Sequence, residues 1–173
     1  MPSAAILAGG RATRFGGLDK GAAIVQGRSI LDRQLAELIQ VTDDILYVGA
    51  NPSAEYLGLL RPVADTLPGL GPLGGLDAAL SAARDDTVLV IAGDMPFLTG
   101  PFLWFLAGLA ETEGRVDAVV PRTVRGTHPL AAAYRKSCRP RVQTMLSAGE
   151  RAMRGLLEGL RVREVGPDEM AGF

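Results

Sequence analysis

Near its N-terminus the chain reads AAILAGGRATRFGGLDK (residues 4–20), a short apolar run that leads into a loop rich in glycine and cations. The apolar run, residues 4–7, predicts a buried β-strand because it is short, aliphatic and followed by glycine. Glycine lets a backbone turn its N–H groups toward an anion, and guanidinium and ammonium groups add positive charge. The loop therefore predicts a phosphate-binding site that includes Gly9, Gly10, Arg14 and Lys20.

Two common phosphate-binding motifs do not match this loop. A P-loop ends in Gly-Lys followed by Ser or Thr, whereas Lys20 is followed by Gly21 and Ala22, so the hydroxyl that holds Mg²⁺ is missing. The dinucleotide fingerprint Gly-x-Gly-x-x-Gly does not fit because Gly9 and Gly10 are adjacent. The remaining alternative is a glycine-rich turn with solvated cations, which the clustering of glycines and cations directly after a strand disfavours.

The rest of the chain alternates between strand-like and helical patterns. Strands are predicted at residues 4–7, 45–48, 88–91, 118–120 and 130–134, with a weaker extended stretch at 61–64. Helices are predicted at residues 29–40, 76–83, 101–110 and 139–146. In the first of these Ser29 can cap the helix, and one face is expected to hold Leu31, Leu35, Leu38 and Ile39. Near-continuously apolar strands separated by helices indicate a parallel sheet that is covered on both faces. We therefore predict an α/β fold, with residues 1–173 forming a single Rossmann-like domain around a mostly parallel sheet with helices on both faces.

Composition limits the classes of function. With 173 residues, 47% hydrophobic and 21% charged, the chain is typical of a globular protein, and its net charge of −1 argues against a general nucleic-acid binder. No apolar run approaches the roughly 18 residues that a membrane span needs. One cysteine and one histidine exclude an internal disulfide and a Cys/His zinc cluster. We expect a cytoplasmic protein with neither nucleic acid nor a membrane as partner.

Two aspartates follow predicted strands, and ligands of open α/β sheets gather at the carboxyl ends of the strands. Asp94, after residues 88–91, is placed to hold Mg²⁺ that bridges to ligand phosphates. The alternative, an N-cap for the next helix, is disfavoured because Thr99 is the better cap for a helix that begins near Pro101. Asp65 is either a magnesium or nucleotide ligand or an exposed turn residue.

Four further features carry weaker signals. Residues 69–75 form a second glycine-rich turn before a helix, either a close approach for a base or ribose or a tight strand-to-helix connection. Residues 115–141 contain seven Lys or Arg against one Asp, which indicates a second anion-binding surface or a solvated face. His128 either contacts substrate or is a hydrogen-bonded loop histidine. For Cys138 we expect a buried, inert thiol.

Four segments together resemble the molybdenum cofactor guanylyltransferases, a nucleotidyltransferase family: residues 7–20, GPLGG at 71–75, GDMPFL at 93–98 and HPL at 128–130. The resemblance covers about residues 4 to 160 in consistent order. The Gly9-Gly10 pair and the DMPFL segment favour the guanylyl enzyme over its cytidylyl relative. Family members usually continue into an Asn-x-Asn-Thr-Pro segment and a final helix, whereas this chain stops at Phe173.

The resemblance implies transfer of GMP from GTP to the terminal phosphate of molybdopterin, with Mg²⁺ as cofactor and pyrophosphate as leaving group. It implies GTP and molybdopterin or the molybdenum cofactor as substrates, and molybdoenzymes or their chaperones as protein partners. The positions that match the family's nucleotide-binding residues are Leu7, Ala8, Gly9, Gly10, Lys20, Asp65 and Asp94. Asp94 also matches the Mg²⁺ ligand, and Arg14, Lys20 and Asp94 match the catalytic set.

Two other classes of function remain open. One is a different nucleotidyltransferase, either a CTP-dependent pterin cytidylyltransferase or a sugar-1-phosphate nucleotidyltransferase, because no feature of the sequence shows which base edge is bound. The other is a carrier that holds a pterin cofactor without chemistry. Pyrophosphate release distinguishes the enzymes from the carrier, and a comparison of GTP, CTP and UTP distinguishes the enzymes from one another.

Overall fold

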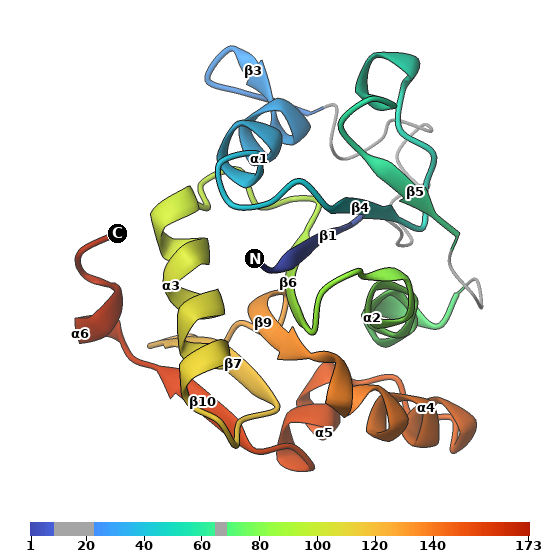
Figure 1. Cartoon of the computed structure of the whole chain (residues 1–173), viewed down its shortest axis with the longest axis vertical. Helices are drawn as coiled ribbons and strands as arrows, with labels where there is room; N and C mark the ends of the chain where they lie inside the picture. Colours follow the sequence, from blue (N-terminus) through green and yellow to red (C-terminus); the bar gives the residue numbers. More distant parts are fainter. Residues whose placement is uncertain (9–22, 65–68) are drawn as a thin grey trace.

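The structure, a computed structural model, describes residues 1–8, 23–64 and 69–173. In this part of the chain an eight-stranded mixed sheet lies between two layers of helices (Figure 1). The strand order is β10-β7-β9-β6-β1-β4-β5, with β8 paired to β7. The predicted α/β fold, a mostly parallel sheet with helices on both faces, is confirmed.

The central strands run parallel. β1 (Ser3–Leu7) pairs in parallel with β4 (Ile45–Val48) and β6 (Thr87–Ala92), and β4 pairs in parallel with β5 (Arg61–Val63). On the other side of β6 the sheet holds β7 (Ala118–Thr123), β8 (Gly126–Thr127), β9 (Ala131–Arg135) and β10 (Val162–Val165). β9 runs antiparallel to both β6 and β7, because the short connection from β7 through β8 is a hairpin and leaves no room for a crossover.

Two helices cover one face of the sheet, α1 (Ile30–Leu38) and α3 (Gly100–Thr112). Three cover the other, α2 (Gly71–Ala82), α4 (Arg139–Ser147) and α5 (Met153–Glu158), as Figure 1 shows. A hydrophobic core lies on each face of the sheet, and alternate residues of β1 point into one or the other. Ala4 and Ile6 pack with α1 and α3, and Ala5 and Leu7 pack with α2. No helix among the described residues is long and apolar enough to cross a membrane.

Short elements complete the fold, and the sequence patterns did not predict them. They are the hairpin β2 (Ile24–Val25) and β3 (Arg28–Ser29), the 3₁₀ turns η3 (Ala54–Tyr56) and η4 (Lys136–Cys138), and the helix α6 (Pro167–Met170). β10 and α5 were also missed. The phenyl ring of Phe173, after α6, stacks on Phe105 of α3 with ring centroids 5.1 Å apart.

α1 begins as predicted. Ser29 caps it, since its hydroxyl accepts a hydrogen bond from the backbone N–H of Asp32 at 3.0 Å. The predicted apolar face was wrong at one position, because Ile39 is 55% exposed and lies past the last helical residue. Gln34 completes the buried face instead, together with the predicted Leu31, Leu35 and Leu38.

α2 corrects a second prediction. It begins at Gly71 rather than near residue 76, so most of the expected glycine-rich turn is helical. Pro72 fits the first turn, where its missing N–H is not needed. Gly75 lies against β1, and a Cβ placed on it would stand 3.3 Å from a methyl carbon of Leu7. Gly75 therefore lets the helix pack tightly on the end of β1.

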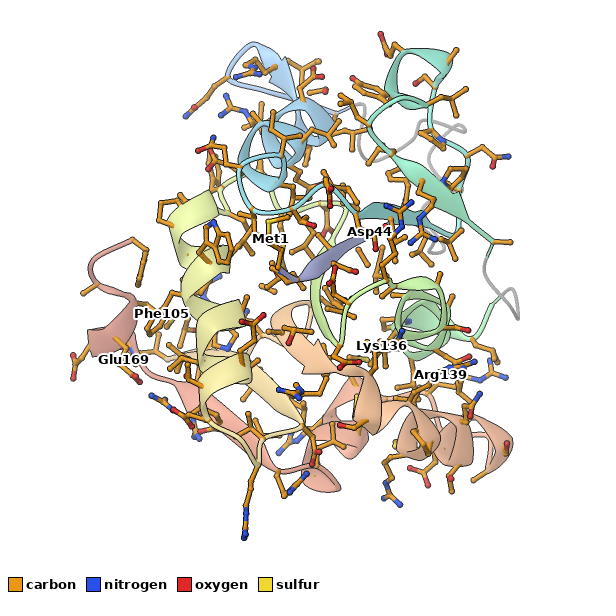
Figure 2. The ribbon with its side chains drawn as sticks, in the orientation of Figure 1. Met1, Asp44, Phe105, Lys136, Arg139 and Glu169 are labelled. Carbon is orange, nitrogen blue, oxygen red and sulfur yellow. The ribbon has the colours of Figure 1, made fainter. Side chains whose placement is uncertain are left out.

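The amino edge of the sheet is held by a buried carboxylate, that of Asp44, which is 2% exposed (Figure 2). It accepts hydrogen bonds from the Ser3 hydroxyl at 2.7 Å, from Arg61 Nη2 at 2.7 Å and from the backbone N–H of Arg84 at 3.0 Å. Burial by itself raises the pKa of Asp44, but these donors outweigh it and hold the pKa below its ordinary value. The cluster fastens β1, β4, β5 and the connection from α2 to β6.

Candidate active site

The carboxyl ends of β1 and β6 meet at the edge opposite Asp44. The N–H of Gly93, which follows β6, donates to the carbonyl oxygen of Leu7 at 3.1 Å, and the N–H of Ala8 donates to Val48 at 2.9 Å. A Cβ on Gly93 would lie 3.3 Å from the Leu7 oxygen and 3.6 Å from the Cα of Ala8, so glycine permits this close approach. The structure therefore brings Leu7, Ala8 and the turn that carries Asp94 to one place.

Asp94 is exposed in a turn that lies well before α3. Thr99 is at the N-cap position of α3, as predicted, but its side chain makes no capping bond. The carboxylate of Glu37 on α1 does so instead, accepting a hydrogen bond from the N–H of Gly100 at 2.6 Å. Asp94 is therefore not the cap of this helix, and its carboxylate stands at the carboxyl edge of the sheet.

The donor set at this edge suits a metal that brings other ligands with it. The described residues contain no cluster of three His, Cys, Asp or Glu side chains that could hold an ion. Mg²⁺ is commonly bound through one or two protein carboxylates, with substrate phosphates and water completing its shell. A single exposed carboxylate such as that of Asp94 fits this mode of binding.

The other residues predicted from the glycine-rich loop lie outside the described part of the chain, namely Gly9, Gly10, Arg14 and Lys20, and so does Asp65. Their roles stay predictions. Ala8 and Ala64, the described residues that come just before the two omitted ranges, follow β1 and β5 and so lie at the carboxyl edge.

The N-terminus of α2 also lies near this edge, beside Leu7. Gly69 and Gly71 have φ values of +87° and +68°, which favour glycine. Arg151 Nη1 donates to the carbonyl oxygen of Gly69 at 3.2 Å, and no side chain of the described residues caps the first turn of α2. Uncapped N–H groups at a helix N-terminus suit an anionic ligand. The predicted approach of a base or ribose here is not tested by the structure.

The cations of residues 115–141 do not form the single anion-binding surface that was predicted, because they lie at two edges of the sheet. Arg122 and Arg125 lie on the β7–β8 hairpin at the carboxyl edge. Arg135 and Lys136 lie at the opposite edge because β9 runs antiparallel, and both donate to backbone carbonyls there. Figure 2 shows Lys136 near α2. The reversal of β9 therefore separates cations that are close in sequence.

A surface hollow of about 620 Å³ lies beside the β7–β8 hairpin. Its lining combines three arginines with apolar side chains and two glutamates: Arg122, Arg125, Arg154, Pro129, Leu157, Val162, Glu158 and Glu164, together with Gly126 and Thr127. Arg122 Nη1 is 2.7 Å from Glu164 Oε2, and Arg154 is 3.8 Å from Glu158. The two glutamates offset part of the positive charge.

The surroundings of His128 and Cys138 bear on their predicted roles. His128 Nε2 is 2.8 Å from the hydroxyl of Thr123, so it is a hydrogen-bonded loop histidine, while contact with substrate stays a prediction. Cys138 is 2% exposed, and burial raises the pKa of its thiol to about 12. The predicted inert thiol is confirmed.

A mostly parallel α/β sheet, with the Asp94 turn and the glycine-rich start of α2 at its carboxyl edge, is the arrangement of a nucleotide-binding protein of the nucleotidyltransferase type. Residues 4–165 match the MobA-like NTP transferase domain, and the chain belongs to that family.

Relatives of the chain carry consistent names. It is 34% identical over 161 residues to the molybdenum cofactor guanylyltransferase of Desulfosudis oleivorans, covering 92% of this chain and 78% of that one. It is 40% identical over 153 residues to the probable molybdenum cofactor guanylyltransferase of Deinococcus radiodurans, covering 88% and 77%. Among solved structures it is similar to molybdopterin-guanine dinucleotide biosynthesis protein A of Archaeoglobus fulgidus, with a TM-score of 0.81, 26% identity, and coverage of 99% and 86%.

Gln34 is the residue near this site that the sequence patterns did not single out. The signal was present, because positions 31, 34, 35 and 38 lie on one helical face. A glutamine there breaks an otherwise apolar stripe.

Proposed function

We propose that this chain transfers GMP from GTP to the terminal phosphate of molybdopterin, forming molybdopterin guanine dinucleotide and pyrophosphate. One observation carries the proposal: the turn with Asp94 lies against the end of β1 at Leu7 and Ala8, in a chain that is 34% and 40% identical to guanylyltransferases. A carboxylate beside a nucleotide-binding edge is what nucleotidyl transfer requires.

In this reaction an oxygen of the acceptor phosphate attacks the α-phosphorus of GTP, and the bond from that phosphorus to the pyrophosphate oxygen breaks. Such transfers need little covalent help, so positioning and charge stabilisation dominate. Arg14 and Lys20 bind and neutralise the departing pyrophosphate. Leu7, Ala8, Gly9 and Gly10 contact GTP, and Asp65 contacts the guanosine side.

Asp94 would hold Mg²⁺ together with the nucleotide, and the bound metal would supply neutralisation of phosphate charge and polarisation of the α-phosphate. Asp94 is exposed at the carboxyl edge of the sheet. Gly93 allows the turn to lie close to β1, so Asp94 is held beside the residues that contact the nucleotide.

The acceptor binds in the hollow beside the β7–β8 hairpin. Arg122, Arg125 and Arg154 supply charge for a phosphate, and the apolar side chains of Leu157 and Val162 suit the ring system of a pterin. The substrate is molybdopterin or the molybdenum cofactor. Direct transfer of the product to a molybdoenzyme or its chaperone in the cytoplasm is a further part of the proposal, and a pull-down with such proteins tests it.

The test is pyrophosphate release with Mg²⁺ and molybdopterin, compared among GTP, CTP and UTP. We expect release with GTP and tightest binding of GTP by calorimetry. Preference for CTP or UTP would assign the chain to another nucleotidyltransferase activity. Binding of the pterin with no pyrophosphate from any nucleotide would assign it to a carrier.

A further inference from the structure

α1 carries a buried amide that contacts the Asp94 turn. Gln34 is 2% exposed, and its Nε2 donates to the carbonyl oxygens of Ala92 at 2.8 Å and Met95 at 3.1 Å. These two carbonyls stand immediately before and after Gly93 and Asp94. We propose that Gln34 is a positioning residue, which fixes the turn so that the Asp94 carboxylate faces the metal and nucleotide. The inference rests on the proposed role of Asp94.

The chemistry of the contact selects glutamine. Two carbonyl oxygens on one side of a buried group require two N–H donors, and a primary amide supplies both from one nitrogen. The reverse orientation of the amide would place its oxygen against two other oxygens, so the contacts define the orientation. Glutamate would repel both carbonyls. Asparagine is shorter by one carbon–carbon bond, about 1.5 Å, and would not reach both.

Backbone contacts and packing also hold this segment, since the N–H of Ala92 donates to the carbonyl oxygen of Leu130 at 2.9 Å and Leu98 packs against the core beneath α1 and α3. The N–H of Gly93 donates to Leu7, and the N–H of Met95 donates to Ala92 at 3.3 Å, a long hydrogen bond. Phe97 is 67% exposed, so its ring contributes little packing. The bond from Glu37 to the N–H of Gly100 holds the far end of the same segment. Two side chains one helical turn apart on α1 therefore bind this segment, Gln34 at residues 92 and 95 and Glu37 at residue 100.

The oxygen of the Gln34 amide also supports a positioning role. Gln34 Oε1 is buried and has no hydrogen-bond donor among residues 1–8, 23–64 and 69–173. An unpaired buried acceptor lowers the stability of the fold. Stability by itself would therefore favour an apolar residue over glutamine at position 34, on the apolar face of α1. Its two donated bonds to the Asp94 turn account for the amide.

Removing the donors has a predictable effect on the proposed reaction. In Gln34→Met a side chain of similar size stays in place, but the turn loses both bonds. Because misplacement of a reacting group by about 1 Å can lower a rate about 10²-fold, we expect kcat to fall about 10- to 100-fold. The Mg²⁺ concentration for half-maximal rate rises about 10-fold, since Asp94 no longer starts in position. KM for GTP changes less than about 3-fold, because the amide touches the turn and not the nucleotide.

The matched control is Leu35→Ala. Leu35 neighbours Gln34, is 5% exposed and packs in the α1–α3 core, so its truncation weakens the fold without removing a bond to the turn. Both variants are compared with the wild-type chain by urea unfolding, by backbone hydrogen exchange of residues 93–95 without substrate, and by Mg²⁺ titration of pyrophosphate release. We expect exchange in the turn to accelerate about 10-fold or more in Gln34→Met beyond any change in global stability, and not in Leu35→Ala.

The two proposals fail in different ways. Wild-type turnover together with equal turn exchange and equal Mg²⁺ dependence in both variants would overturn the role of Gln34 and leave the proposed function standing. Absence of turnover in the wild-type chain would overturn the proposed function and the positioning role together. Gln34→Asn serves as a second variant: full wild-type behaviour with the shorter amide would also overturn the inference.

Discussion

Asp44→Ala is expected to destabilise the protein strongly without affecting the active site. The carboxylate is 2% exposed and accepts hydrogen bonds from Ser3, Arg61 and Arg84. Removing one partner of a buried, hydrogen-bonded ion pair costs about 3–5 kcal/mol. The Arg61 side chain is 36% exposed, so water can hydrate its freed guanidinium, and the lower value of about 3 kcal/mol applies. For a domain of this size that corresponds to a fall in Tm of about 6–12 °C.

The pH dependence of stability follows from the lowered pKa of Asp44. A carboxyl whose pKa is lower in the folded state stabilises the fold above its unfolded pKa of about 3.9, and this contribution is lost as the pH falls through the folded pKa. The wild-type chain should therefore lose this stability below about pH 4. The Asp44→Ala variant has already lost it, so the gap between the two should narrow in acid.

The assay is thermal and urea unfolding at pH 7, 4 and 3, with Asp43→Ala as control. Asp43 is the exposed neighbour, and its removal should change stability by no more than about 0.5 kcal/mol. Equal melting temperatures for the two variants at pH 7 would refute the reasoning about the buried carboxylate. A large loss of kcat in Asp44→Ala, measured well below its melting temperature, would contradict the placement of the site at the opposite edge of the sheet.

Asp94→Ala should lower turnover by about 10² or more at saturating GTP and ordinary Mg²⁺, the usual scale for a lost preorganised electrostatic contact, and near-normal activity would contradict the metal assignment. Arg122→Ala should raise KM for the pterin acceptor about 10-fold and leave KM for GTP unchanged, whereas Arg115→Ala, at the other edge, should alter neither. The thiol of Cys138, with a pKa of about 12, should not react with a disulfide reagent at pH 8 until urea unfolds the chain, and rapid native labelling would contradict its burial.

The sequence correctly predicted the elements that are specified by residues close together in the chain. The aliphatic run of β1, the strand before Asp94 and the Ser29 cap of α1 all lie where expected, since side-chain pattern and capping chemistry act within a few residues. The predicted start of α2 was wrong because a glycine that lets this helix pack on Leu7 cannot be told from a turn glycine by its sequence neighbours. β10 was missed because two of its four residues, Arg163 and Glu164, are charged, so the strand carries little apolar signal.

The amino-acid pattern alone was sufficient for the α/β class, for the family resemblance and for the position of Asp94 after a central strand, because each depends on residue type and order along the chain. Three-dimensional packing was needed for the rest. The direction of β9 separates Arg122 from Lys136, and the bond from Gln34 to Ala92 joins residues 58 positions apart. No local pattern encodes such contacts, because they exist only after α1 has packed on the sheet and the chain has brought both partners together.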